Sequence, residues 1–244
     1  MRFAGKTAAV FGGNSGIGLA AAQAFVSEGA RVAITGRNQA TLAAAAATGM
    51  LAIRADMGSP GDSKAAMTRI AAELGGIDVL CVNAGIGGFS AIAEVTEDFW
   101  DGIHMVNLRG AFFALQAALP HLRDGGSVVV TGSIGAVLAL RGNAAYASAK
   151  AGLRAVARTL ALELLPRRIR VNMVSPGPID TEIFKRGTSA AQVEGLRTMM
   201  TNAVPMKRMG EAAEVAHAIL FLASSEASFI NGVDLYVDGG CVEL

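Results

Sequence analysis

Short apolar runs alternate with segments of helical periodicity from one end of the chain to the other. The runs that predict strands are residues 7–11, 31–35, 51–55, 78–82, 127–131, 169–174 and 233–237. The segments that predict helices are residues 17–28, 39–48, 60–74, 96–123, 145–165, 189–202 and 211–224. Most strand runs are apolar throughout, which is typical of a parallel sheet that helices cover on both faces. We therefore expect an α/β fold, with one doubly wound domain over residues 1–244 and about seven parallel strands.

Several helix boundaries are marked by capping and breaking residues. Ser59 precedes Pro60, an order that favours a helix start. Thr96 is expected to cap a long helix that runs to about Arg123, and Pro120 is expected to bend its last turn.

The composition excludes several classes of protein. The chain has 244 residues, of which 52% are hydrophobic, and its formal net charge is +1. It is too apolar for a disordered chain and offers no excess positive charge to nucleic acid or anionic lipid. No apolar stretch reaches the roughly 18 residues of a membrane span, and the N-terminus lacks the apolar core of a signal peptide. With two distant cysteines, Cys81 and Cys241, we expect a reduced cytoplasmic protein that binds neither nucleic acid nor membranes.

A glycine-rich turn joins the first predicted strand to the first predicted helix. Gly12, Gly16 and Gly18 lie in the segment FGGNSGIG, with the spacing G-x-x-x-G-x-G. Glycines here allow a tight turn and bring a pyrophosphate close to backbone N–H groups at a helix N-terminus. An ordinary glycine-rich turn is the alternative, but the strand–turn–helix context favours a dinucleotide site in a Rossmann domain.

The end of the second predicted strand indicates which dinucleotide binds. An acidic residue there would accept hydrogen bonds from the ribose hydroxyls of NAD. Here the sequence reads ITGRN, so Gly36 leaves space and Arg37 offers a guanidinium group to a 2′-phosphate. Against the alternative of a solvated surface arginine, we predict NADP(H) in preference to NAD(H).

Tyr146 and Lys150 form a candidate catalytic pair. They are four residues apart in the segment YASAK, which places them on one face of a predicted helix. A lysine cation near a phenol lowers the phenol pKa from about 10, so that it can exchange a proton with a carbonyl or hydroxyl oxygen. The pair alone is weak evidence, because it also occurs by chance on solvated helix faces. Ser133 strengthens it, since it follows a buried strand at the edge where open α/β sheets bind ligands.

Together these motifs resemble the short-chain dehydrogenase/reductase family over nearly the whole chain. The motifs that follow the family's order are the glycine turn, Asp56, Asn83-Ala84-Gly85, Asn107, Ser133, Tyr146, Lys150, Pro176-Gly177 and the late Asp238-Gly239-Gly240. A serine thirteen residues before Tyr-x-x-x-Lys, together with the glycine turn, is a specific combination. The members that the chain resembles are carbonyl reductases and 3-oxoacyl-carrier-protein reductases.

The resemblance implies a catalytic set and a cofactor site. Tyr146 would be the general acid, Lys150 would bind the nicotinamide ribose and depress the tyrosine pKa, and Ser133 would hold the substrate oxygen. Asn107 would kink its helix and support a water chain to the lysine. The residues expected at the cofactor are Gly12, Asn14, Ser15, Gly16, Ile17, Gly18, Arg37, Asp56, Met57, Asn83, Ala84, Gly85, Tyr146, Lys150, Pro176, Gly177, Ile179 and Thr181. Among them, Asp56 would contact the adenine, and Ile179 and Thr181 would meet the nicotinamide carboxamide and the phosphates.

Three positions depart from the residues that are usual in the family. Phe11 stands where it usually has Thr, Val82 where it often has Asn, and Gly132 where it often has Ser. All three border strand ends, so they put local hydrogen bonding in doubt rather than the chemistry. The three histidines are scattered without the spacing of metal ligands, and no metal site is expected.

Apolar residues near the predicted site favour an apolar substrate. A substrate lid is expected at residues 178–208. The apolar side chains of the lid and of the segment after Ser133 are Ile183, Phe184, Leu196, Met199, Met200, Val204, Met206, Val137, Leu138 and Leu140. We therefore predict reduction of ketones to secondary alcohols with NADPH, as in a carbonyl reductase or alcohol dehydrogenase. A 3-oxoacyl-carrier-protein reductase is the main alternative, and sugar or polyol oxidation is a third.

A different class of function stays open, and so does the assembly. A non-catalytic, NADP-sensing protein would keep the glycine turn, although such proteins usually lose the tyrosine or the lysine. The two long predicted helices, residues 96–123 and 145–165, and the C-terminal strand resemble the interfaces of the family. We expect a homotetramer, whose other partner is a small carbonyl or alcohol substrate.

Overall fold

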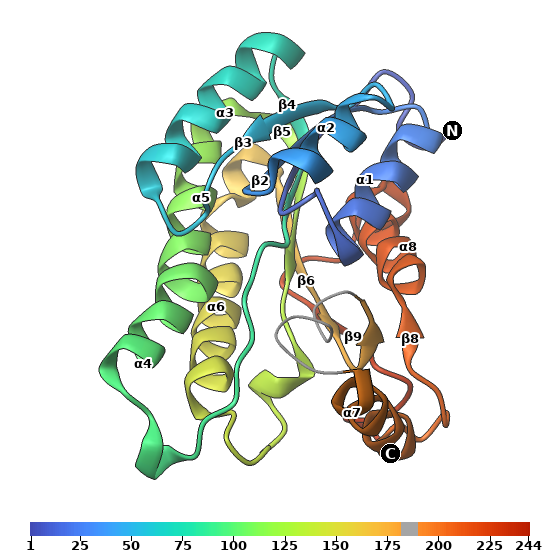
Figure 1. Ribbon diagram of the computed structural model, residues 1–244. Helices are drawn as coiled ribbons and strands as arrows, with labels where there is room; N and C mark the ends of the chain where they lie inside the picture. Colours follow the sequence, from blue (N-terminus) through green and yellow to red (C-terminus); the bar gives the residue numbers. More distant parts are fainter. Residues whose placement is uncertain (182–189) are drawn as a thin grey trace.

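The centre of the molecule is a parallel sheet of seven strands in the order β3-β2-β1-β4-β5-β6-β9 (Figure 1). The structure, a computed structural model, describes residues 1–181 and 190–244. The strands are β1 (Thr7–Phe11), β2 (Arg31–Gly36), β3 (Leu51–Arg54), β4 (Ile77–Val82), β5 (Leu122–Thr131), β6 (Arg170–Pro176) and β9 (Asp234–Val237). The predicted α/β fold with about seven parallel strands is therefore confirmed.

Helices cover both faces of this sheet, as the apolar strand runs predicted. They are α1 (Gly16–Ser27), α2 (Gln39–Ala46), α3 (Pro60–Leu74), α4 (Glu97–His104), α5 (Ala111–Ala118), α6 (Ala144–Glu163), α7 (Ala190–Ala203) and α8 (Ala212–Ala223). In Figure 1, α3, α5 and α6 lie on one side of the sheet and α1 and α8 on the other. Two apolar core clusters match these layers, one packed under α3, α5 and α6 and one under α1 and α8. Because β1 and β4 contribute to both clusters, their side chains are buried in every direction.

The predicted capping residues start their helices as expected. The Ser59 side chain accepts a hydrogen bond from the Asp62 N–H at the start of α3, and Pro60 occupies its first turn. The Thr96 side chain accepts a hydrogen bond from the Phe99 N–H at the start of α4.

The helical run predicted from Thr96 to about Arg123 is present, with irregular turns at Asn107 and Pro120, where a kink and a bend were expected, and it ends at His121. A π-helical turn, η2 (Met105–Gly110), separates α4 from α5. The helical run then ends in a short 3-10 turn, η3 (Leu119–His121), because Pro120 has no N–H to continue the helix. β5 begins at Leu122 and carries Arg123, whose guanidinium group binds Asp78 Oδ2 at 2.6 Å and the Gly75 carbonyl at 2.6 Å.

A second, two-stranded sheet has no counterpart in the predictions. β7 (Ile179–Asp180) pairs in parallel with β8 (Gly210–Glu211), and the Gly210 N–H donates to the Pro178 carbonyl at 2.9 Å. Strands of two residues have no periodicity that a sequence pattern could reveal. The small sheet joins the two ends of the segment predicted as a lid.

The lid itself stays a prediction. Ile183 and Phe184, two of its predicted apolar residues, lie outside the described residues. Of the described ones, Val204 is buried, whereas Met199 and Met206 are exposed. Arg197 on α7 pairs with Asp180 on β7, with its Nη2 2.7 Å from Oδ1. Within residues 1–181 and 190–244, no helix combines the length and apolar character that crossing a membrane requires.

Candidate active site

The predicted site residues gather at the carboxyl edge of the large sheet. β1 ends at the glycine turn, β4 ends just before Asn83, and β5 ends two residues before Ser133. β6 ends at Pro176. Ligands of open α/β sheets bind outside this edge, so four separate segments converge where a cofactor is expected.

The glycine turn is packed too tightly to admit side chains. Gly12 has φ +73°, and a Cβ there would lie 2.7 Å from the Cα of Ala84. A Cβ on Gly18 would lie 2.1 Å from the Gly12 carbonyl oxygen. The neighbouring segment holds the turn, because the Ala84 N–H donates to the Phe11 carbonyl at 3.0 Å and Asn83 Nδ2 to the Gly12 carbonyl at 3.2 Å. The glycine turn therefore presents backbone without side chains next to the N-terminus of α1.

The N-terminus of α1 is suited to an anion. Ser15 is the N-cap residue in an extended conformation, and its side chain makes no capping hydrogen bond. The first turn of α1 carries no acidic side chain. Ile17 packs its side chain against the core under α1, so it can offer a ligand only its backbone. The N–H groups of this turn therefore provide a favourable place for a phosphate group.

The space at Gly36 is used differently from the prediction. A Cβ on Gly36 would lie 2.3 Å from Asn14 Cγ, so the Asn14 side chain occupies this space. Asn14 Nδ2 donates a hydrogen bond to Thr41 Oγ1 at 2.8 Å. The glycine therefore serves the protein's own turn rather than leaving space for a 2′-phosphate.

Arg37 and Asp56 lie next to each other beyond the ends of β2 and β3. Arg37 Nη1 is 3.5 Å from Asp56 Oδ2, and both side chains are exposed. Asp56 Oδ1 also accepts a hydrogen bond from the Gly58 N–H at 2.9 Å. Met57, which follows Asp56 in the sequence, is buried. The Arg37 and Asp56 side chains are thus held at the surface and are accessible to a ligand.

Lys150 is buried and points at the end of β5. Its side chain comes from α6, and Nζ donates to the Thr131 carbonyl at 2.9 Å. Nζ lies 5.9 Å from the centre of the Tyr146 ring, one helical turn earlier. Burial lowers the pKa of Lys150 from 10.5 to about 8.

Ser133 lies close enough to Tyr146 to lower the pKa of its phenol. Its Oγ accepts a hydrogen bond from the Gly135 N–H at 3.0 Å. Burial raises the pKa of Tyr146 above 10.0, and the nearby Ser133 hydroxyl lowers it by less. The net shift of the Tyr146 pKa is therefore opposite to the one expected from a nearby lysine cation, because desolvation is the largest cause in this structure, where the Lys150 ammonium group donates to the Thr131 carbonyl.

Asn107 lies within the π-helical turn and is completely buried. Its Nδ2 donates to the Ile86 carbonyl at 2.8 Å, and its Oδ1 accepts from the Ile86 N–H at 3.0 Å. A Cβ on Gly85 would lie 2.8 Å from Asn107 Oδ1 and 3.6 Å from Lys150 Nζ, so these three residues lie together. π-Turns inside helices are often found at functional sites, and this one aims the asparagine at the backbone after β4.

The last predicted cofactor segment follows β6. The Gly177 N–H donates to the Val237 carbonyl at 3.0 Å, and a Cβ on Gly177 would lie 2.7 Å from the Cα of Asp238. Ile179 is buried on β7. Thr181 Cγ2 would lie 3.6 Å from a Cβ on Gly16, which brings this segment beside the glycine turn.

The three positions that depart from the family pattern are closely packed within the protein. Phe11 and Val82 are buried in the core. A Cβ on Gly132 would lie 2.3 Å from Ser175 Oγ, so a serine there would clash. Among the described residues, no cluster of three or more metal-ligating side chains is found.

Sequence reasoning missed Thr131 as part of the site. Its carbonyl accepts a hydrogen bond from the Lys150 ammonium group, and its Oγ1 donates one to Asn83 Oδ1 at 3.1 Å. The only signal in the sequence is its place as the last residue of a buried strand. Thr131 therefore links the lysine to the segment that packs on the glycine turn.

Comparisons with known proteins agree with this geometry. The model of the family described as "Enoyl-(Acyl carrier protein) reductase" matches residues 12–242. Oxidoreductase asL5 of Sarocladium schorii is 38% identical over 100% of this chain and 98% of its own length. The 3-oxoacyl-[acyl-carrier-protein] reductase MabA of Mycobacterium avium is 35% identical over 98% of this chain and 90% of its own length.

A solved structure extends the likeness to three dimensions. The short chain dehydrogenase of Burkholderia cenocepacia, in complex with NADP, has a TM-score of 0.88 and 37% identity, and the match covers 99% of each chain. The glycine turn, the Tyr146–Lys150 pair and Ser133 thus occur in a chain that matches these proteins over almost its whole length. The chain belongs to the short-chain dehydrogenase/reductase family of oxidoreductases.

Proposed function

We propose that this protein reduces ketones to secondary alcohols with NADPH, in a reversible reaction. The observation that carries the proposal is the convergence of Ser133, Tyr146 and Lys150 beside the glycine turn. The relative from Burkholderia cenocepacia that was solved with NADP supports the choice of cofactor.

The residues of the site fit a nicotinamide dinucleotide. A Cβ on Gly12 or Gly18 would occupy space that the chain's own backbone already fills, so the turn presents only backbone to a pyrophosphate. The first turn of α1 would hold its charge, and Asn83, Ala84 and Gly85 would line the cofactor opposite. The segment from Pro176 to Thr181 would contact the nicotinamide end, and Asp56 and Met57 the adenine end. Bound NADPH would supply the hydride that reaches the carbonyl carbon.

The chain's own residues would handle the proton and the oxygen. Tyr146 donates its phenolic proton to the carbonyl oxygen as negative charge develops there. Ser133 donates a hydrogen bond to the same oxygen and so stabilises that charge. Lys150, which is held at Thr131, places a positive charge near the phenol and favours loss of its proton. Asn107 fixes the backbone at Ile86, beside Gly85, and keeps this wall of the site in place.

A small panel of substrates tests the proposal. We would measure NADPH oxidation with an aryl ketone, an aliphatic ketone, an acetoacetyl thioester and a ketose, each repeated with NADH. Turnover of the simple ketones with NADPH is the expected result. No NADPH oxidation with either ketone, while the cofactor still binds, would contradict the proposed reaction.

Reduction of 3-oxoacyl thioesters is the second candidate. The observations that favour it are the acyl-carrier-protein family description and the 35% identity to MabA of Mycobacterium avium. Turnover of the thioester alone would move the protein to this activity, and turnover of the ketose alone would favour sugar oxidation. A non-catalytic NADP-sensing role is disfavoured because Asn107, Ser133, Tyr146 and Lys150 are all present and lie together.

Arg37 is proposed to select NADPH over NADH. Its exposed guanidinium group would bind the 2′-phosphate, a charge-assisted contact that contributes about 1.5–3 kcal/mol. We expect Arg37→Leu to lower kcat/KM for NADPH roughly ten- to a hundredfold and to leave kcat/KM for NADH within about twofold. Arg69→Leu, at an exposed position of α3, is the matched control. Equal losses with both cofactors, or similar kcat/KM values for both in the parent, would contradict this role.

We also propose that the protein is a cytoplasmic homotetramer. Large apolar side chains are exposed along the helical layer from α4 to α6, among them Trp100, Phe112 and Leu162. Such side chains are commonly covered between subunits. Light scattering should give four times the mass of the chain, and a monomer would contradict the proposal. The two cysteines are both free, which is consistent with a reducing compartment.

A further inference from the structure

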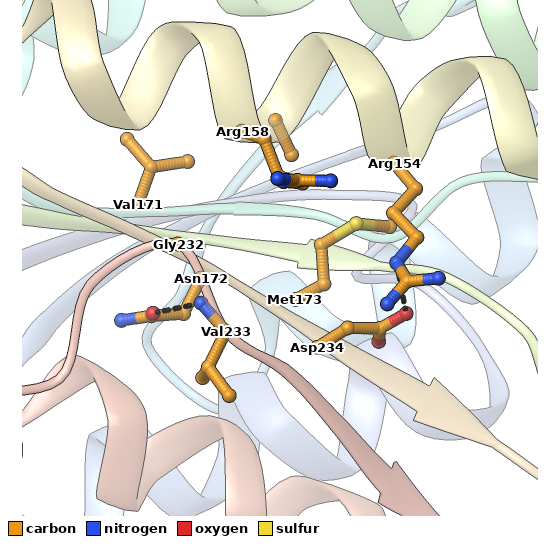
Figure 2. A pocket seen from close by; sticks show the side chains of 9 residues that line it. Arg154, Arg158, Val171, Asn172, Met173, Gly232, Val233 and Asp234 are labelled. Carbon is orange, nitrogen blue, oxygen red and sulfur yellow. Dashed lines mark hydrogen bonds and ion pairs between the residues drawn. The ribbon is translucent and has the colours of Figure 1, made fainter.

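A buried carboxylate joins three elements behind the proposed site. Figure 2 shows the place, a small hollow between α6 and the strands β6 and β9, with Arg154 and Asp234 facing each other. The Asp234 side chain is only 5% exposed. Arg154 Nε lies 3.2 Å from Asp234 Oδ2, and Ser175 Oγ donates a hydrogen bond to Asp234 Oδ1 at 2.6 Å. We call these three residues the Asp234 bridge.

Each partner in the Asp234 bridge comes from a different element. Asp234 is the first residue of β9, Arg154 lies on α6, and Ser175 is the penultimate residue of β6. A carboxylate that is removed from water requires charged or hydrogen-bonding partners, because an unpaired buried charge is strongly unfavourable. The bridge therefore keeps α6, β6 and β9 at fixed separations.

The same elements carry the proposed catalytic residues. Arg154 is one helical turn after Lys150, on the same face of α6. Ser175 directly precedes Pro176 and Gly177, which would contact the nicotinamide. The bridge thus connects the helix of the tyrosine and lysine to the strand that ends at the cofactor.

Ser175 also meets the strand end that carries Ser133. The Gly132 N–H donates to the Val174 carbonyl at 2.8 Å. A Cβ on Gly132 would lie 2.3 Å from Ser175 Oγ, so the serine hydroxyl lies directly over the glycine. Because Asp234 fixes the rotamer of Ser175, it also limits how Gly132, and with it Ser133, can move.

We propose that Arg154, Asp234 and Ser175 are positioning residues, which hold Ser133 and the nicotinamide turn in register with Tyr146 and Lys150. The inference rests on the proposed ketone reduction. A misplacement of about 1 Å in a catalytic constellation can cost a hundredfold in rate, so partial loosening of the bridge has a measurable effect.

Steady-state kinetics of single and double variants provide the first test. We expect Arg154→Gln and Ser175→Ala each to lower kcat about tenfold, while KM for the ketone and Kd for NADPH stay within about twofold. The kcat of the double variant should be no lower than that of the less active single variant, because both substitutions act through the same carboxylate. Arg154→Lys should recover most of kcat, which a loss of packing alone would not explain. Arg158→Gln, on an exposed arginine that lines the same hollow, is the control and should equal the parent.

Several outcomes would overturn the inference. They are a hundredfold loss in the double variant, an equal loss in Arg158→Gln, or a lowered melting temperature with unchanged kcat in Arg154→Gln and Ser175→Ala.

Hydrogen exchange provides a second test that does not depend on any substrate. In Ser175→Ala we expect faster exchange of the Gly132 amide, whose partner is the Val174 carbonyl, with amides of α1 unchanged. If the parent reduces no ketone of the panel, the proposed function fails, and this exchange result alone decides whether the bridge positions Gly132. If the parent is active, and kcat and the exchange rate of the Gly132 amide are unchanged in every variant, the bridge has no positioning role.

Discussion

Replacement of Tyr146 by phenylalanine should lower kcat for ketone reduction about a thousandfold or more. General acids contribute on the order of 10²–10⁴ in rate, and Tyr146 is the proposed acid, with Lys150 Nζ 5.9 Å from the centre of its ring. The substitution removes one hydroxyl group and keeps the ring, so the affinity for NADPH should stay within about twofold. Single-turnover kinetics and a fluorescence titration with NADPH measure the two quantities.

The chain offers a matched control for this experiment. It has two tyrosines, and the other, Tyr236, is part of β9. Tyr236→Phe should leave kcat unchanged. A Tyr146→Phe variant as active as the parent would contradict the assignment of the acid and would favour the non-catalytic NADP-sensing alternative.

Replacement of Lys150 by methionine should abolish activity and at the same time stabilise the fold. The activity is lost because the cation beside the phenol is lost, and we expect kcat/KM to fall at least a hundredfold. The gain in stability follows from burial, which lowers the Lys150 pKa from 10.5 to about 8. A shift of that size corresponds to about 3 kcal/mol, of which the lost hydrogen bond to the Thr131 carbonyl offsets about 1 kcal/mol. A site that destabilises the fold in this way is typical of an active centre.

The pH dependence of the gain has a definite sign. Between about pH 8 and 10.5 the unfolded parent binds more protons at Lys150 than the folded parent, so the parent becomes more stable as the pH rises through this range. The advantage of Lys150→Met is therefore largest below about pH 8 and decreases toward pH 10.5. Urea unfolding at several pH values measures it, with Lys64→Met on the exposed face of α3 as control. A methionine variant that is less stable than the parent by the same margin at every pH would contradict this account.

The parts of the fold that could be predicted are those with a local signal. β1 and β4 are buried on both faces, so nearly all their residues are apolar, and Ser59 and Thr96 mark helix starts by their own chemistry. The π-turn at Asn107 leaves no mark on the apolar pattern, because one extra residue in a turn hardly disturbs the period of a long helix, and only the resemblance to the family implied a kink there.

The site shows the same division between local and distant information. Tyr146 and Lys150 could be paired from the sequence because they are one helical turn apart on α6. The glycine turn could be recognised because side chains at its glycines would overlap neighbouring backbone. The direction of the Lys150 ammonium group depends on Thr131, and the Asp234 bridge joins residues that meet only after the sheet has formed. The raised Tyr146 pKa was missed for that reason, since burial is a property of the assembled site.

The small sheet of β7 and β8 makes one segment of the chain exchangeable. Ile179 pairs with Gly210 and Asp180 with Glu211, so the two ends of the segment between these strands lie at adjacent points. Closing a loop between fixed ends costs only about 0.6 kcal/mol more for each doubling of its length. Residues 181–209 could therefore be replaced by the corresponding segment of a relative, longer or shorter, without any change in the register of the seven-stranded sheet. The predicted substrate lid at residues 178–208 implies that this exchange would transfer substrate preference as one unit, while Ser133, Tyr146 and Lys150, the proposed catalytic residues, stay in place.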